Sequence, residues 1–102
     1  MGSYRNRLDI IADILQVASQ SAKKTQIMYQ ANLSYKVLQR YLGDITSASL
    51  ISFKIEERCY VLTRKGREFL EAYRDYVKIN KRVEKHLNDV DSKKKNLEEL
   101  CS

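Results

Sequence analysis

The feature that most constrains this chain is the stretch from Arg67 to Ser102, which contains neither glycine nor proline. If the stretch forms one helix, a rise of 1.5 Å per residue makes that helix roughly 50 Å long. The 66 residues that precede it form a body too small to cover such a length. Its apolar side chains therefore need a partner outside their own body, and a second copy of the chain is the simplest one.

The apolar side chains of this stretch recur at alternating steps of four and three residues. We call the following positions the seam: Phe69, Tyr73, Tyr76, Asn80, Val83, Leu87, Val90, Lys94, Leu97 and Cys101. A repeat of about 3.5 residues is typical of a coiled coil. A break of the helix within 88–92 remains an alternative, because four of those five residues are poor helix formers. The pattern predicts a homodimer with the following interface residues: Phe69, Tyr73, Tyr76, Asn80, Val83, Leu87, Val90 and Leu97.

The residue pattern of segment 23–42 predicts two short helices joined by a tight turn. Apolar residues gather on one face of each helix: Ile27, Met28 and Ala31 on the first, and Val37, Leu38, Tyr41, Leu42 and Ile45 on the second. Thr25 suits the N-cap of the first helix, because its hydroxyl can accept a hydrogen bond from an unpaired amide. Asn32 suits the left-handed position that closes a helix. Ser34 is then the expected N-cap of the second helix, which runs over 34–49.

The elements around this segment complete a winged-helix order. They are predicted as follows: a helix over 4–19, a strand over 51–55, a turn over 56–58 and a returning strand over 59–62. Ile51, Phe53 and Ile55 alternate with polar residues, as expected of a half-buried strand. Thr63 is the expected N-cap of the last helix, and Gly66 in its first turn indicates close approach to a neighbouring segment.

The helix over 34–49 is a candidate recognition helix. Its outward face carries Lys36, Gln39, Arg40 and Gly43. Arginine pairs with guanine and glutamine with adenine, while lysine and tyrosine suit phosphates. The predicted DNA-binding residues are Ser34, Tyr35, Lys36, Gln39, Arg40, Lys23, Lys24, Gln26, Lys54 and Arg58. Arg5 and Arg7 are weaker candidates, because an N-terminal arm is usually mobile. The alternative is that these are ordinary solvated residues of an amphipathic helix.

The charge distribution favours a nucleic acid as the partner. Residues 1–66 hold ten Lys/Arg and five Asp/Glu, a net charge of +5, whereas residues 67–102 hold nine and eight, a net charge of +1. The excess positive charge thus lies on the body, as expected of a nucleic-acid-binding domain.

Other classes of function find no support. The single histidine, His86, lies beside Leu87 on the long helix, and there is no carboxylate pair, phosphate-binding glycine loop or nucleophile motif. Cys59 and Cys101, 42 residues apart, do not form a metal or disulfide framework. No apolar run approaches the length of about 18 residues that a membrane span needs. We therefore expect no enzyme, no catalytic residue, no cofactor, no metal and no small-molecule substrate.

Two strings of residues resemble a known family. The first is TQIMYQANLSY at 25–35, followed by Leu38 and Tyr41; the second is YVLTRKG at 60–66, followed by Phe69. They resemble the archaeal "10a" proteins, small winged-helix DNA-binding chromatin proteins of crenarchaea. The resemblance implies a homodimer joined by an antiparallel coiled coil, with a winged helix at each end that binds DNA. The chain departs from the family at 48–49 and at its acidic, glycine-free wing tip, which puts contacts by the wing in doubt.

These observations combine into one prediction. The fold is mainly α with a small β-hairpin, a winged helix-turn-helix over 1–66 followed by a long coiled-coil dimerisation helix over 67–102. The function is binding of double-stranded DNA by a homodimer of architectural or chromatin type, in the cytoplasm and associated with the nucleoid. The alternatives are a sequence-specific transcription regulator and a winged-helix protein-interaction module.

The orientation of the coiled coil gives a testable prediction. Asn80 by itself suits a parallel pair in which asparagine faces asparagine, whereas the family resemblance implies an antiparallel pair. In a parallel dimer the two Cys101 thiols are adjacent; in an antiparallel dimer they lie at opposite ends. We expect mild oxidation of the dilute protein to give little Cys101–Cys101 dimer on a non-reducing gel, and efficient crosslinking would contradict the antiparallel choice.

Overall fold

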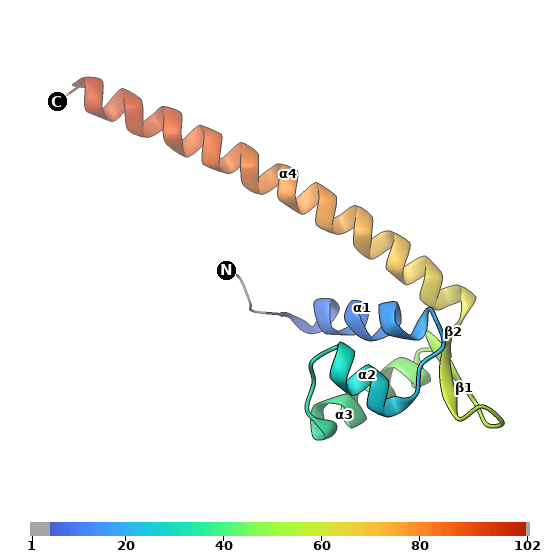
Figure 1. Cartoon of the computed structure of the whole chain (residues 1–102). Helices are drawn as coiled ribbons and strands as arrows, with labels where there is room; N and C mark the ends of the chain where they lie inside the picture. Colours follow the sequence, from blue (N-terminus) through green and yellow to red (C-terminus); the bar gives the residue numbers. More distant parts are fainter. Residues whose placement is uncertain (1–4, 102) are drawn as a thin grey trace.

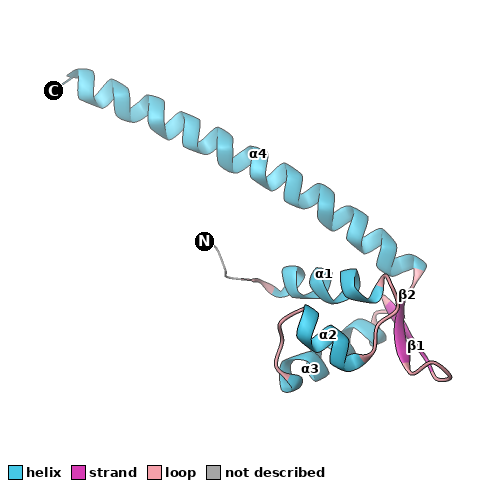
Figure 2. Cartoon of the chain, viewed as in Figure 1, coloured by secondary structure: helices cyan, strands magenta, loops and turns pink. Residues whose placement is uncertain are grey.

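The chain folds into a small body from which one long helix projects (Figure 1). The computed structural model describes residues 5–101, so Tyr4 and Ser102, at the ends of predicted helices, lie outside the described residues. The elements are α1 (Arg7–Ala18), α2 (Lys24–Gln30), α3 (Tyr35–Ser47), β1 (Ile51–Lys54), β2 (Cys59–Leu62) and α4 (Arg64–Cys101) (Figure 2). This order confirms the predicted winged helix-turn-helix followed by a long helix.

The body is held together by an apolar core between α1, α2, α3, the hairpin and the start of α4. Its buried residues are Ile11, Ala12, Ile14, Leu15, Ala18, Ala22, Ile27, Ala31, Leu38, Tyr41, Leu42, Ile45, Leu50, Ile51 and Leu70. The helical spacing predicted the core residues of α3, namely Leu38, Tyr41, Leu42 and Ile45. Leu8, in the first turn of α1, remains 44% exposed.

The helix-turn-helix forms as the turn residues predict. Asn32 adopts a left-handed backbone with φ of 53° between α2 and α3. The Oγ of Ser34 accepts a hydrogen bond of 3.3 Å from the backbone N of Val37, so Ser34 is the N-cap of α3. α3 ends at Ser47 rather than at Ser49, because Ser49 has a φ of 64° that a right-handed helix cannot contain.

The predicted N-cap of α2 is wrong. Lys23 occupies that position, its side chain makes no capping hydrogen bond, and Thr25 lies within the first turn. The cause is a contact with the hairpin. The backbone N of Ala22 donates to the oxygen of Tyr60 at 3.0 Å, and the N of Tyr60 donates back at 2.7 Å. This pairing holds the chain extended up to Lys23, so the helix starts immediately afterwards.

The wing is a two-stranded antiparallel hairpin, in which Ile51 pairs with Leu62 and Lys54 with Cys59. Its loop spans residues 55–58, so the prediction that Ile55 lies in the strand is wrong. Arg58 closes the loop with a φ of 51°, a backbone conformation more usual for glycine or asparagine. Ile55 is consequently at the tip of the hairpin, 80% exposed.

α4 is one continuous helix of 38 residues. This confirms the prediction of one uninterrupted helix and excludes the alternative of a break within 88–92. The Oγ1 of Thr63 accepts from the backbone N of Gly66 at 3.0 Å, as expected of an N-cap. The same hydroxyl donates to the oxygen of Ser49 at 2.6 Å, and the backbone N of Thr63 donates to the oxygen of Leu50 at 3.2 Å. Lys65 donates from Nζ to the oxygen of Ala48 at 2.8 Å. The start of α4 thus satisfies the carbonyls that follow α3.

Two polar contacts fix the direction in which α4 leaves the body. The hydroxyl of Tyr73 donates to Oδ1 of Asp9, and Arg74 donates from Nη2 to Oε1 of Gln16 at 2.7 Å. The hydrogen bond to Asp9 raises the pKa of Tyr73 to about 12, with burial as the second cause. The bonds from Tyr73 and from the backbone of Asn6 lower the pKa of Asp9 below its ordinary value of 3.8. The contact is therefore fully formed over the whole physiological range of pH.

Gly66 and Gly43 both lie in helices, but only Gly66 is crowded by its surroundings. They give a matched pair for testing the contact between the start of α4 and Leu50. A Cβ on Gly66 would overlap the backbone oxygen of Leu50 and lie 2.6 Å from Cδ1 of Leu62, whereas a Cβ on Gly43 would meet nothing within 4 Å. We expect Gly66→Ala to lower the free energy of unfolding by about 1–3 kcal/mol through overpacking. Gly43→Ala should raise it by about 0.5–1 kcal/mol. Urea titrations followed by circular dichroism measure both, and a Gly66→Ala variant as stable as the parent would contradict the close approach.

Candidate nucleic-acid interface

The outward face of α3 is polar and basic. Lys36, Gln39, Arg40 and Gly43 are all exposed, while Leu38, Leu42 and Ile45 on the opposite face are buried. Lys36 and Arg40 form no ion pair with any other residue in the described range 5–101. The guanidinium carbon of Arg40 lies 5.6 Å from the centre of the Tyr41 ring. The face thus presents two unpaired cations and an amide on a rigid helix.

Gly43 is an unusual residue for the middle of an exposed helix. Glycine weakens a helix by roughly 1 kcal/mol relative to alanine. The body gives no reason for this cost, because a Cβ at position 43 would meet no atom within 4 Å. A residue without a side chain at this point instead lets an external surface approach the backbone of α3 closely.

Lys24, Tyr35 and Gln39 form a cluster that joins α2 to α3. The Nζ of Lys24 lies 3.2 Å from the hydroxyl of Tyr35 and 4.4 Å from the centre of its ring. Nζ also donates to Oε1 of Gln39. Because the oxygen of Gln39 is occupied by this bond, its amide NH₂ is the part of the side chain left to donate. Lys24 therefore orients Gln39, and the three residues act as one group.

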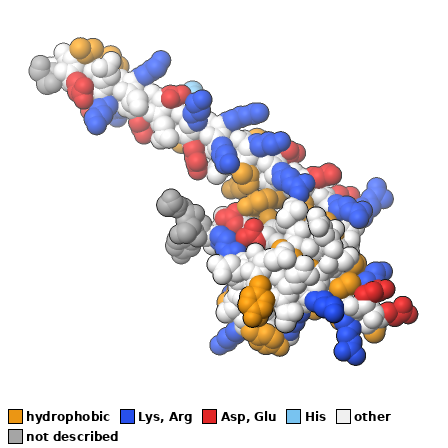
Figure 3. Space-filling model, viewed as in Figure 1, with side chains coloured by type: hydrophobic (Ala, Val, Ile, Leu, Met, Phe, Trp, Pro, Cys, Tyr) orange, Lys and Arg blue, Asp and Glu red, His pale blue; other side chains and the backbone are white. Residues whose placement is uncertain are grey.

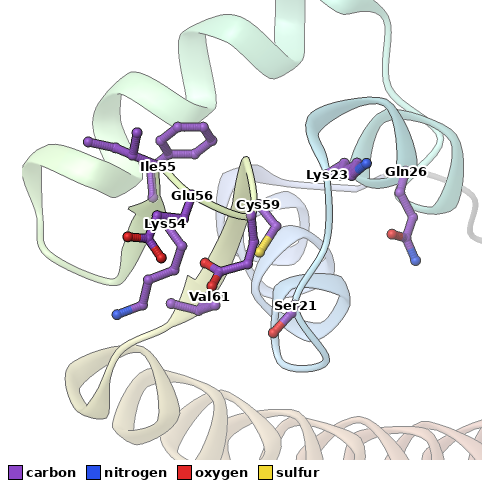
Figure 4. Close-up of a pocket in the computed structure, with 10 residues that line it drawn as sticks. Ser21, Lys23, Gln26, Lys54, Ile55, Glu56, Cys59 and Val61 are labelled. Atoms are coloured by element: carbon purple, nitrogen blue, oxygen red, sulfur yellow. The ribbon is translucent and has the colours of Figure 1, made fainter.

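A groove of about 980 Å³ separates the start of α2 from the hairpin. Figure 4 shows Lys23 and Gln26 on one side of it and Lys54, Ile55 and Glu56 on the other. The structure thus brings Lys23, Gln26 and Lys54 together around one groove. These side chains suit a phosphate backbone, although the nearby carboxylate of Glu56 opposes it.

The wing tip carries no net charge. Lys54 and Arg58 are balanced by Glu56 and Glu57, and all four are exposed. Its most prominent side chain is the apolar Ile55. The tip offers a polyanion no excess positive charge. That the wing contacts DNA only weakly therefore stays a prediction.

Arg5 has a structural role that the sequence did not indicate. Its Nη1 donates to Oδ2 of Asp13 at 2.9 Å and to the backbone oxygen of Ala31 at 2.6 Å. Its Nη2 donates to the backbone oxygen of Asn32 at 2.9 Å. One guanidinium thus ties α1 to the turn of the helix-turn-helix. The two carbonyls belong to Ala31 and Asn32, far from Arg5 in the sequence, so no local pattern could reveal the contact.

The predicted dimer residues divide into two groups. Phe69 and Tyr73 pack partly against the core of the same chain. From Tyr76 onward the seam leaves the body and its apolar side chains are exposed: Tyr76 50%, Val83 49%, Leu87 56%, Val90 48% and Leu97 64%. Ile79 and Leu100, beside the seam, are 58% and 76% exposed. Asn80, Lys94 and Cys101 are exposed as well. This apolar stripe has no cover among the described residues 5–101.

Residues 5–101 offer neither a candidate metal site nor a helix that could span a membrane. This range contains no cluster of His, Cys, Asp or Glu that could hold a metal ion. None of its helices is long and apolar enough to cross a membrane.

The role of Arg5 can be tested against its neighbour Arg7, which is exposed and forms no ion pair with the described residues. We expect Arg5→Ala to lower the free energy of unfolding by about 1–3 kcal/mol, because two carbonyls lose a charged donor. Arg7→Ala should change it by no more than about 0.5 kcal/mol. Denaturant unfolding measures both values, and equal effects of the two substitutions would contradict the assignment.

The chain is similar to known proteins in sequence and in structure. Residues 4–81 match the winged helix-turn-helix family. An uncharacterized protein of Methanocaldococcus jannaschii, MJ0290, is 34% identical over 76 residues, which are 74% of this chain. The chain spans about a third of that relative, 35% of its length. The crystal structure of Sso10a-2, a DNA-binding protein from Sulfolobus solfataricus, superposes with a TM-score of 0.79 at 24% identity, covering 86% of this chain and 95% of that one. The predicted resemblance to the archaeal 10a proteins is thus confirmed in the fold, and the chain belongs to the winged helix-turn-helix family.

Proposed function

We propose that this protein binds double-stranded DNA through the exposed face of α3, within a DNA-binding domain over residues 1–66. The observation that carries the proposal is the composition of that face. Lys36 and Arg40 are unpaired cations, Gln39 is oriented by Lys24, and Gly43 opens the helix backbone to close approach. A helix with these groups can enter the major groove and contact both bases and phosphates.

The surroundings of α3 support DNA rather than a protein as the partner. The groove beside α2 adds Lys23, Gln26 and Lys54. The net charge of +5 on residues 1–66 attracts a polyanion over a wide area. The helix-turn-helix is a common way of holding a recognition helix against a duplex. Sso10a-2, which shares the fold, is itself a DNA-binding protein.

We further propose a homodimer in which residues 67–102 form an antiparallel coiled coil. The exposed part of the seam, from Tyr76 to Leu97, supports a helical partner with the same repeat. Lys94 favours the antiparallel direction, since a parallel pair would set two Lys94 ammonium groups opposite each other within the seam. Asn80 favours the parallel direction; we follow the family resemblance and propose the antiparallel pair.

An antiparallel dimer of this shape has a DNA-binding body at each end of a rod. Such a molecule can hold two stretches of DNA or bend one, which is the activity of an architectural protein associated with the nucleoid. A transcription regulator that reads one operator is the second candidate. Gln39 and Arg40 favour it, because both side chain types can discriminate bases.

The proposal predicts that α3 and not general charge determines DNA affinity. Lys36→Ala combined with Arg40→Ala should weaken binding by roughly tenfold to a few hundredfold, as expected when one base contact of about 1–3 kcal/mol and a phosphate contact are lost. Lys93→Ala combined with Lys95→Ala removes the same charge from the far end of α4 and should have little effect. Mobility-shift titrations with specific and random duplexes at two salt concentrations measure the affinities.

Gly43→Ala gives a second arm of this experiment, because it should weaken DNA binding while leaving the protein at least as stable. Binding that is unchanged in both α3 variants would contradict the proposed interface. A footprint confined to one short inverted repeat in the presence of excess competitor would favour the regulator over the architectural protein.

A further inference from the structure

The half of α4 nearest the body carries a row of basic side chains on one side. We call Arg74, Lys78, Lys81 and Lys85 the outer stripe; all four are exposed. Steps of four, three and four residues keep neighbouring members on adjacent turns of the helix. Within residues 5–101 none of them forms an ion pair, and Arg74 donates only to the neutral amide oxygen of Gln16. Four cations thus face solvent without an ion pair to any residue in this range.

The outer stripe points away from the seam. With 3.6 residues per turn, its mean direction lies roughly 160° around the helix axis from that of seam positions 76, 80, 83 and 87. A second helix packed on the seam would therefore leave the outer stripe in solvent, whichever direction that helix runs. Figure 3 shows Lys and Arg side chains gathered along this part of α4.

Like charges recur along the outer stripe. The pairs Arg74–Lys78, Lys78–Lys81 and Lys81–Lys85 place like charges on adjacent turns, and each such pair costs about 0.2–0.5 kcal/mol. Acidic residues at the same spacing offset this cost: Glu71, Asp75, Glu84 and Asp89. The only acidic residues of this segment, Asp75 and Glu84, lie roughly 90° to either side of the stripe.

The two halves of α4 differ in this respect. Residues 74–85 hold five Lys/Arg and two Asp/Glu, a net charge of +3. Residues 86–101 hold three lysines and four acidic residues, a net charge of −1. A general need for a charged, solvated surface applies to both halves equally and does not explain the difference. The concentration of positive charge near the body instead indicates an anionic partner there.

We propose that the outer stripe is a second DNA-contacting surface, which binds the phosphate backbone of a duplex lying along α4 without reading its sequence. The choice of duplex DNA as the polyanion rests on the proposed function of α3. From Arg74 to Lys85 the stripe extends about 17 Å along the helix, a length over which one DNA strand presents roughly five phosphates. Four flexible cations can reach a row of phosphates at this spacing.

The position of the stripe separates it from the first interface. Figure 1 shows α1 between α4 and the pair α2 and α3. DNA along the outer stripe would therefore be a segment separate from the DNA bound on α3. The long helix thereby contacts DNA itself, in addition to joining two bodies.

Lysine reactivity in the full-length protein tests the proposal directly. The protein is acetylated briefly with an N-hydroxysuccinimide ester, alone and with excess random-sequence duplex at low salt, and each lysine is quantified by mass spectrometry. We expect the duplex to slow acetylation of Lys78, Lys81 and Lys85 as well as Lys36, and to leave Lys95 unchanged. Protection of Lys36 without protection of the three stripe lysines overturns the outer stripe while supporting the α3 interface. Protection of none of them overturns both.

Salt dependence provides a second, independent readout. The double substitution Lys78→Gln and Lys81→Gln should reduce the magnitude of the negative slope of log affinity against log salt by about 1.8, since each lost phosphate contact removes about 0.9. The control Lys93→Gln with Lys95→Gln removes the same charge from the distal half and should leave the slope unchanged. Circular dichroism verifies that both variants remain helical. Equal slopes for the two variants would overturn the proposal, because general electrostatic attraction would then account for any loss of affinity.

Discussion

The arrangement of the whole molecule depends on the contact between the start of α4 and the end of α3. Thr63 and Lys65 donate to the carbonyls of Ala48, Ser49 and Leu50, which follow the last turn of α3. Gly66 then allows the backbone of α4 to pass directly over Leu50. α3 closes its own end, since the backbone N of Ser49 donates to Thr46 and that of Leu50 donates to Ile45. The first turn of α4 then supplies donors to the three carbonyls that follow.

This junction links the direction of the rod to that of the candidate recognition helix. Asp9 and Tyr73 add a second point of attachment between α1 and α4, so the rod is held to the body from two sides. Arg5 in turn holds α1 against the turn between α2 and α3. These contacts connect the exposed face of α3 to the seam through a chain of rigid elements. In the dimer that we propose, the packing of two seams would set how two such faces are oriented toward DNA.

The residues of the candidate interface that lie on one helix could be predicted from the sequence. The contacts that form between two elements could not. Helical spacing alone places Lys36, Gln39, Arg40 and Gly43 on one face of α3. The bond from Lys24 to Gln39 joins residues 15 positions apart and depends on how α2 crosses α3. The groove that collects Lys23 and Lys54 likewise exists only because the hairpin folds back beside α2.

The sequence by itself determined the elements whose causes are local. Ser34 and Thr63 carry their own capping hydroxyls, Asn32 tolerates a left-handed backbone, and the absence of glycine and proline after Gly66 keeps α4 continuous. Only the tertiary structure decided the start of α2 and the role of Arg5. In both cases the partner lies across the fold: a strand that pairs with Ala22, and carbonyls that Arg5 meets only after folding. Local hydrogen bonds and steric limits can be read along the chain, but contacts between distant segments arise only when a common core brings those segments together.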